Sequence, residues 1–230
     1  MEFSIIILLI TFIFFLVANV PIALAIGLST ALSMIITIPI TPALTTIAQQ
    51  IATGINSFAL LAIPFFILSG YIMAQGGIAK RLINFAKVIV ASLPGGLAYV
   101  NIIACMFFGA ISGSAAAATS AVGGVMIPSM NKEGFDKNFN TALTVTASTT
   151  GLLIPPSNIL IIYSLASGGV SISALFIAGY IPGLLIGFSL IIVAGIMAKI
   201  YRYPSGNRYG MKETMNKSLD AIPSLMLIYI

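Results

Sequence analysis

Two stretches of the sequence combine helix-weakening residues with hydroxyl side chains inside long uncharged segments. The first is ISGS, residues 111–114, within a segment that has no charge from Val88 to Asn131. Glycine weakens a helix, and in hydrocarbon an irregular backbone survives only where protein or a polar cavity satisfies its N–H and C=O groups. The stretch therefore predicts a tip between two half-helices at membrane depth. A close-packing interface of small residues is the alternative interpretation.

The second stretch is STTGLLIPPSN, residues 148–158, in a segment without charge from Asn138 to Ala198. Pro155 and Pro156 supply no N–H and clash with the preceding turn, so a helix must break there. A plain proline kink is the alternative. Two interrupted segments rich in hydroxyl groups indicate a transporter binding site. The polar side chains at this break are Ser148, Thr149, Thr150, Ser157 and Asn158.

Each break exposes the carbonyl end of one half-helix, which carries partial negative charge and suits a cation. No carboxylate lies in either segment, and divalent ions would want carboxylates. Carbonyl and hydroxyl oxygens at low formal charge favour a weakly held monovalent ion such as Na+. We therefore predict a Na+ site bracketed by seven residues: Ser112, Gly113, Ser114, Thr149, Thr150, Gly151 and Pro155.

Each break also exposes the N–H end of the next half-helix, which suits an anion. Ser114 is a natural N-cap for such an end, and the second break repeats the arrangement. We predict that a solute binds at Ser114, Ala115, Ser157 and Asn158. Proton-driven carriers usually use an intramembrane Asp, Glu or His, and these spans contain none, so we expect Na+ coupling.

Composition identifies the class of protein and excludes several functions. The chain is 59% hydrophobic and 7% charged, with a mean hydropathy of +1.13, which is typical of an integral membrane protein. No basic patch interleaved with aromatic residues suggests nucleic-acid binding. A single Cys105 and the absence of His argue against a metal cluster and leave Ser112 and Ser114 without a base. We expect no organic cofactor. An intramembrane enzyme is therefore disfavoured.

Two other functions are alternatives to a transporter. A channel subunit would show uncoupled, voltage-driven ion flux, and a purely structural module does not explain the paired breaks.

The breaks must be positioned by helices, several of them long enough to cross a membrane. Apolar stripes opposite polar faces predict interfacial amphipathic helices at 43–56 and 79–92. The apolar run 221–230 is too short to cross, so we expect a truncated or split helix there. The other predicted elements are spans 3–18, 21–38, 57–75 (kinked at Pro64) and 171–198, a broken stretch 97–128, a polar loop 129–138, a Pro-Pro-broken span 139–165 and a basic segment 199–217.

Basic residues cluster at 80–87, 132–137 and 199–217. If 97–128 is a re-entrant hairpin, all three clusters lie on one face, which the positive-inside rule makes the cytoplasm. This predicts five full crossings and an outside N-terminus. It divides the chain into scaffold helices and an interfacial helix (1–56), a third span and arm helix (57–96), half of a transport domain (97–198) and a cytoplasmic linker that ends at the start of a helix (199–230).

The joint spacing of several motifs resembles the large membrane subunit of tripartite ATP-independent periplasmic (TRAP) transporters. The motifs are LLAIPFFILSGYIMAQGGIAKRLINFA (60–86), PGGLAYVNI (94–102), FFGAISGSAAAATSAVGGVMIPSM (107–130), TASTTGLLIPPSNILIIYSLASG (146–168) and LFIAGYIPGLL (175–185). The resemblance implies an all-α integral membrane protein, one repeat of an elevator-type carrier that imports organic acids with Na+.

The resemblance also implies partners and a location. The partners are a small four-helix membrane subunit and an extracytoplasmic solute-binding protein, in a bacterial inner membrane. Sialic acid and four-carbon dicarboxylates are both candidate solutes. Another Na+-coupled anion symporter of a related elevator fold is the alternative. Two departures stand out: Ala117 and Ala118 occupy positions where many relatives carry an acidic residue, and the second inverted repeat of the family's large subunit is missing. We therefore expect this chain to be an N-terminal half.

Overall fold

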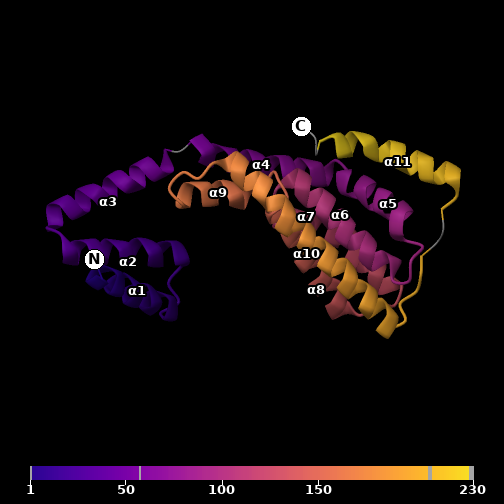
Figure 1. Ribbon diagram of the computed structural model, residues 1–230, viewed down its shortest axis with the longest axis horizontal. Coiled ribbons are helices and arrows are strands. Elements are labelled where there is room, and N and C mark those ends of the chain that lie inside the picture. Colours follow the sequence, from indigo (N-terminus) through magenta and orange to yellow (C-terminus); the bar gives the residue numbers. More distant parts are fainter. Residues whose placement is uncertain (1, 57, 207–208, 228–230) are drawn as a thin grey trace. The chain divides into compact units, whose positions relative to one another are not determined.

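The computed structural model of the protein describes residues 2–56, 58–206 and 209–227. Within these ranges its secondary structure consists of helices and one isolated β-bridge between Pro94 and Ser205 (Figure 1). The prediction of an all-helical protein is confirmed. The chain divides into two compact units, Met1–Phe58 and Ala59–Ile230.

The first unit contains α1 (Glu2–Val17), α2 (Ile22–Thr37) and α3 (Ile40–Ile55). The predicted helices 3–18, 21–38 and 43–56 are present with slightly shifted bounds. α1 packs on α2 through small residues of α2 spaced four apart, Ala25, Ser29 and Ser33, which are buried. Ser33 Oγ donates a hydrogen bond of 2.9 Å to the carbonyl of Ser4. Small residues at a contact let the backbones of two apolar helices approach closely.

The second unit is built around α6, which packs against α5, α7, α8 and α10 and against a single 3₁₀ turn, η1. Val100, Ile102, Cys105 and Phe108 of α6 are completely buried. The elements of the unit are α4 (Phe58–Gln75), α5 (Ile78–Val90), α6 (Gly96–Ser112), α7 (Ala115–Lys132), α8 (Lys137–Ser148), η1 (Thr149–Leu152), α9 (Asn158–Ala166), α10 (Ile172–Ile200) and α11 (Met211–Met226).

The segment that follows α10 contacts the start of α6 and the end of α7. Its Pro204 carbonyl accepts a hydrogen bond of 3.1 Å from the N–H of Gly95, at the start of α6. Its Tyr203 ring stacks on Phe135, just beyond the end of α7, with centroids 4.1 Å apart. The start of α6 and the end of α7 therefore both lie near this segment, and α6 and α7 form a hairpin whose turn is at Gly113 and Ser114.

Two predicted boundaries are wrong. The polar loop 129–138 is reduced to residues 133–136, because α7 continues through Pro128 to Lys132. Proline removes only one hydrogen bond of a helix, and neighbouring helices can stabilise a helix that contains one. α4 continues through Pro64, in agreement with a single predicted span over 57–75. The predicted boundary between the basic segment 199–217 and the apolar run 221–230 is the second error, because α11 continues across it; residues 228–230 lie outside the described part.

α11 is amphipathic and packs on α5, with Arg81 Nε 3.7 Å from a carboxylate oxygen of Asp220. Its apolar residues recur at the three- and four-residue spacing of one helix face, for example Met215, Leu219 and Ile222. This periodicity extends into the basic segment, which is why the helix begins earlier than the apolar run suggests.

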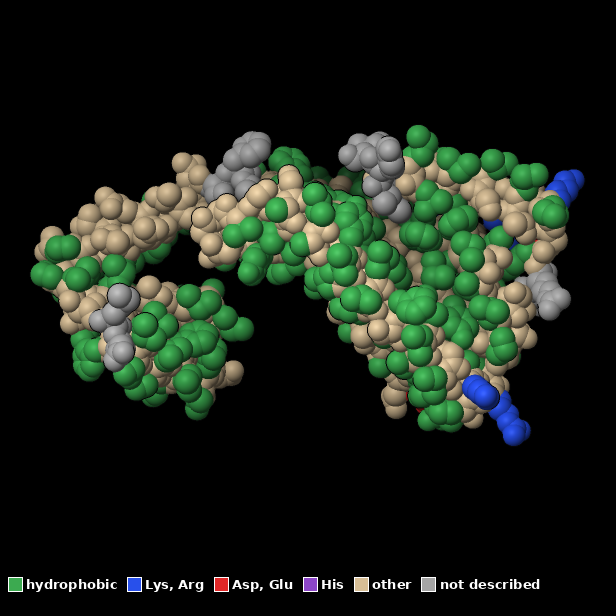
Figure 2. Space-filling model, in the orientation of Figure 1, with side chains coloured by type: hydrophobic (Ala, Val, Ile, Leu, Met, Phe, Trp, Pro, Cys, Tyr) green, Lys and Arg blue, Asp and Glu red, His purple; other side chains and the backbone are tan. Residues whose placement is uncertain are grey.

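Much of the surface is apolar, as expected for a protein in lipid. α10 exposes 72% of Ile177 and 70% of Ile181, and Figure 2 shows apolar side chains spread across the face in view. Among the described helices α10 is long and apolar enough to cross a membrane unbroken, and α3 with α4 passes the same test only when the two are counted together. α1, α2 and α6 are apolar but shorter.

Candidate functional site

The tip between α6 and α7 is built by Ser112, Gly113 and Ser114. Gly113 has φ 62°, a left-handed conformation that glycine adopts at little cost, and it ends α6. Ser114 is the N-cap of α7, since its hydroxyl accepts a hydrogen bond of 3.3 Å from the N–H of Ala117. The Ser112 side chain is completely buried, and its hydroxyl lies 3.4 Å from both the nitrogen and the carbonyl oxygen of Ser114. Ala115 is half-buried at the start of α7.

The second break begins where α8 tightens into η1 and ends at the N-cap of α9. The Thr149 hydroxyl donates to the carbonyl of Thr146 at 2.7 Å, and the Thr150 hydroxyl donates to that of Ala147 at 2.6 Å. Gly151 lies inside η1, one residue before its end. Pro155 is buried and precedes Pro156 through a cis peptide bond.

Ser157 joins the two sides of this second break. Its hydroxyl accepts a hydrogen bond of 3.4 Å from the N–H of Leu160 in α9, and it donates one of 2.5 Å to the carbonyl of Leu152 in η1. Its side chain is completely buried. One hydroxyl therefore caps α9 and satisfies a carbonyl at the end of η1, which fixes the shape of the break.

The two breaks touch each other. The N–H of Asn158 donates a hydrogen bond of 3.3 Å to the carbonyl of Gly113. A Cβ added at Gly113 would lie 2.7 Å from the carbonyl oxygen of Pro156, and one added at Gly109 would lie 2.5 Å from the Cα of Gly151. Residues predicted from separate stretches, 112–114 and 156–158, are thus neighbours in space.

This contact collects four helix ends in a part of the chain without formal charge. The carbonyl ends of α6 and η1 carry partial negative charge, and the N-termini of α7 and α9 carry partial positive charge. The described residues contain no cluster of His, Cys, Asp and Glu that could hold a metal ion. Any cation here must therefore bind to carbonyl and hydroxyl oxygens.

The predicted residues do not all offer free groups. The N–H of Asn158 donates to the carbonyl of Gly113, and the N–H of Ser114 faces the hydroxyl of Ser112 at 3.4 Å, so both predicted anion-attracting ends already use their first N–H. The Asn158 side-chain oxygen is buried and has no hydrogen-bond partner among the described residues. The hydroxyls of Thr149 and Thr150 donate to carbonyls, which leaves the lone pairs of their oxygens available to a cation.

A pocket of about 420 Å³ lies beside the tip, between α4 and the first turns of α7. It contains the hydroxyls of Ser114, Ser120 and Tyr71. Gly70 of α4 makes room for the tip, because a Cβ there would lie 3.3 Å from the Cβ of Ser112. The sequence did not predict Gly70, Tyr71 and Ser120 as site residues. A glycine and a serine inside apolar helices were the only local signals.

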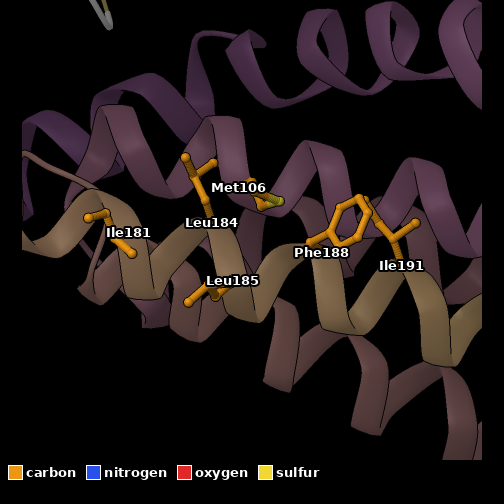
Figure 3. A pocket seen from close by; sticks show the side chains of 6 residues that line it. All are labelled: Met106, Ile181, Leu184, Leu185, Phe188 and Ile191. Atoms are coloured by element: carbon orange, nitrogen blue, oxygen red, sulfur yellow. The ribbon is translucent and has the colours of Figure 1, made fainter.

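A second pocket, of about 430 Å³, lies between α6 and α10 and has a different character (Figure 3). Figure 3 shows Met106 of α6 beside the apolar side chains of α10. No side chain that lines it carries a charge or a hydroxyl, so it suits an acyl chain rather than a polar solute. Its lining residues are Met106, Ile181, Leu184, Leu185, Phe188 and Ile191.

Comparison with known proteins places this arrangement in context. A family model described as the DctM component of tripartite ATP-independent periplasmic transporters matches residues 9–230. The uncharacterized protein YgiK of Salmonella typhimurium is 49% identical over 228 residues, which is 99% of this chain and 52% of that protein.

Two relatives from Vibrio cholerae are named for their solutes. The large permease protein of a C4-dicarboxylate TRAP transporter is 41% identical over 93% of this chain and 47% of its own length. The large permease protein of a sialic acid TRAP transporter is 39% identical over 78% of this chain and 42% of its own length. The chain spans about half the length of the curated relatives it matches.

Proposed function

Because the chain belongs to the family of DctM components of tripartite ATP-independent periplasmic transporters, we propose that it forms one half of the large membrane subunit of a Na+-coupled importer of organic acids. The motif resemblance to that family is confirmed. The observation that carries the proposal is the contact between the two helix breaks, at Gly113 with Asn158 and at Gly109 with Gly151. It concentrates carbonyl and N–H ends of helices in one uncharged region, as a cation and an organic anion carried together require.

The Na+ ion is proposed to bind at the carbonyl ends of α6 and η1. Ser112 and Gly113 contribute from the tip, with Ser114 following. Thr149, Thr150, Gly151 and Pro155 contribute from the second break, through hydroxyl lone pairs and backbone carbonyls. These are hard, neutral oxygen ligands, which suit a weakly bound monovalent cation better than a divalent one.

The solute is proposed to place a carboxylate at the N-termini of α7 and α9, where Ser114, Ala115, Ser157 and Asn158 lie. The pocket beside Ser114 is of the size that holds a small organic molecule. The two relatives from Vibrio cholerae are named for a C4-dicarboxylate and for sialic acid, both organic anions. An organic acid is therefore the proposed class of solute.

The hairpin of α6 and α7 is proposed to be re-entrant, so that both of its ends lie on the cytoplasmic face. Support comes from the segment 203–206, which contacts the start of α6 and the residues just after α7. This arrangement also places the basic clusters on one side, in agreement with the positive-inside rule. We propose that the helices that carry the two breaks move together across the membrane as the transport half of an elevator.

The family's description as tripartite supports two partners. We propose a small four-helix membrane subunit and an extracytoplasmic solute-binding protein that delivers the solute, with the assembly in a bacterial inner membrane. The apolar pocket between α6 and α10 is proposed to face membrane lipid. Relatives named as transporter permeases argue against an intramembrane enzyme.

The experiment uses a full-length permease, meaning a permease of the relatives' length that contains residues 1–230. It is reconstituted in proteoliposomes with its membrane subunit and binding protein. An inward Na+ gradient is expected to drive accumulation of a labelled organic acid, with sialic acid and a C4-dicarboxylate as the two solutes tested. An equal K+ gradient is the control. Equal uptake in Na+ and K+ contradicts Na+ coupling, and voltage-driven Na+ flux without solute indicates a channel.

A further inference from the structure

A chain of hydrogen-bonded polar side chains runs through the apolar core of the second unit, between α6 and α8. Asn101 of α6 donates a hydrogen bond of 2.7 Å to the hydroxyl of Thr144 in α8, and that hydroxyl donates one of 2.7 Å to the carbonyl of Asn140. The Asn140 side chain donates in turn to Asn131, at the end of α7, at 2.7 Å. Asn101, Asn140 and Thr144 are completely buried.

This network of hydrogen bonds also extends in the opposite direction, towards the second helix break. The thiol of Cys105 lies 3.6 Å from the side-chain oxygen of Asn101, and the hydroxyl of Ser148 lies 3.6 Å from that sulfur. Ser148 is the last residue of α8, directly before η1. The network therefore starts at Asn131, in the last turn of α7, and ends at Ser148, directly before the proposed ion site.

The spacing of these residues ties the network to the contact between the breaks. Asn101, Cys105 and Gly109 follow one another at four-residue intervals on α6, so they lie along one face of that helix. Asn140, Thr144 and Ser148 have the same spacing on α8. Gly109 meets Gly151 two turns beyond Asn101, about 12 Å along the axis at 1.5 Å per residue.

In an apolar core, hydrophobic contacts alone fix the position of one helix along another poorly, because a shifted helix can repack. The Asn101 side-chain nitrogen donates to the Thr144 hydroxyl at 2.7 Å and lies 3.7 Å from the weakly accepting sulfur of Met130. A buried hydrogen bond of this kind favours one register, since a shift leaves the donor without its strong acceptor. We propose that the Asn101–Thr144 hydrogen bond is a positioning device that sets the register of α6 on α8 and so keeps the two helix breaks in contact. This inference rests on the proposed function only where Na+ binding is used as its readout.

Thr144 allows a test that separates hydrogen bonding from packing. Its methyl group packs on α7, where a Cβ added at Gly123 would lie 2.9 Å from it, and its hydroxyl serves Asn101. Thr144→Val keeps a methyl group at that position and removes the hydroxyl. Thr144→Ser keeps the hydroxyl and removes the methyl group. A positioning role and a packing role therefore predict opposite orders for the two variants.

The experiment is carried out on the full-length permease with its partners. It measures the Na+ concentration for half-maximal uptake, the maximal rate, and amide hydrogen exchange at 109–114 and 149–158. Thr144→Val is expected to raise the half-saturating Na+ concentration about fivefold and to speed exchange at both breaks. Thr144→Ser is expected to stay within about twofold of the parent. The control for general loss of stability is Val100→Ala. Val100 is buried in α6, next to Asn101, and its side chain makes no hydrogen bond.

Each outcome supports or overturns the positioning role of the Asn101–Thr144 hydrogen bond. Faster exchange and a shifted Na+ curve in Thr144→Val, with both near parental values in Thr144→Ser, support the positioning role. Faster exchange in Thr144→Val in a permease whose uptake does not depend on Na+ supports the positioning role and refutes the Na+ coupling. The inference is overturned if Thr144→Val behaves as the parent, if Thr144→Ser is the more affected variant, or if Val100→Ala shifts both readouts as much as Thr144→Val.

Discussion

Substitution of Gly113 by alanine tests the contact between the two helix breaks in detail. Gly113 has φ 62°, and a Cβ at this position would lie 2.7 Å from the carbonyl oxygen of Pro156. That oxygen belongs to the backbone, so it cannot move aside as a flexible side chain would. The added methyl group must separate the tip from the second break.

The expected cost has two parts. A residue with a side chain loses about 1 kcal/mol in a left-handed conformation. Separation of the breaks loses the hydrogen bond from the N–H of Asn158 to the carbonyl of Gly113, worth about 1 kcal/mol. Since about 1.4 kcal/mol is tenfold in an equilibrium constant, the second part alone corresponds to about fivefold and both together to about 30-fold.

The assay is the Na+ dependence of uptake by the full-length permease in proteoliposomes. Gly113→Ala is expected to raise the half-saturating Na+ concentration by about fivefold to about 30-fold, and Gly113→Val by more, because a β-branched side chain is bulkier and stiffer. The matched control is Gly134→Ala. Gly134 has φ 84° and no atom within 4 Å of an added Cβ, so it has the same backbone cost without the contact.

Two results would refute the reasoning. If Gly113→Ala retains the parental Na+ curve, the contact between the breaks does not contribute to Na+ binding and the tip is a packing motif. If Gly134→Ala shifts the curve as much as Gly113→Ala, the effect comes from backbone strain and not from the second break.

Three further predictions concern the ion ligands, the topology and the transport activity of residues 1–230 alone. Ser112→Ala removes one buried hydroxyl at the tip and should raise the half-saturating Na+ concentration a few-fold, whereas Ser92→Ala, at an exposed site outside both breaks, should leave it unchanged. Lys80→Cys, exposed on α5, should react with a membrane-impermeant maleimide from the cytoplasmic side only; labelling from the outside only contradicts the predicted topology, in which this helix lies on the cytoplasmic face. Residues 1–230 alone should not accumulate solute in vesicles, because they supply half of the proposed site, and uptake by this chain alone would contradict that view.

The helices and the two break regions could be predicted because their signals are local. Gly113 in an apolar run and the Pro155–Pro156 pair each weaken a helix by themselves. The end of α7 was predicted too early: the helix continues through Pro128 to Lys132, because packing within a bundle can outweigh the loss of one backbone hydrogen bond. α11 was divided wrongly because its lysines stand between its apolar residues in the sequence. They were therefore assigned to a basic segment separate from the apolar run.

The contacts that assemble the site could not be predicted in the same way. Gly109 and Gly151, or Gly113 and Asn158, are distant in sequence, and nothing in a single sequence says which glycine faces which. Asn101 was visible as an amide in an apolar helix, but its partner Thr144 was one hydroxyl among many. Pairings of this kind depend on the tertiary packing of α6 on α8.

The central claim is that both helix breaks bind the same Na+ ion, and the most direct test needs no transport. Amide hydrogen exchange of the purified full-length permease is compared in Na+ and in K+ at equal ionic strength. We expect Na+ to slow exchange at 109–114 and at 149–158 together, with the same dependence on Na+ concentration, and to leave α1 and α2 unchanged. Protection at one break only, or at neither, would contradict the account.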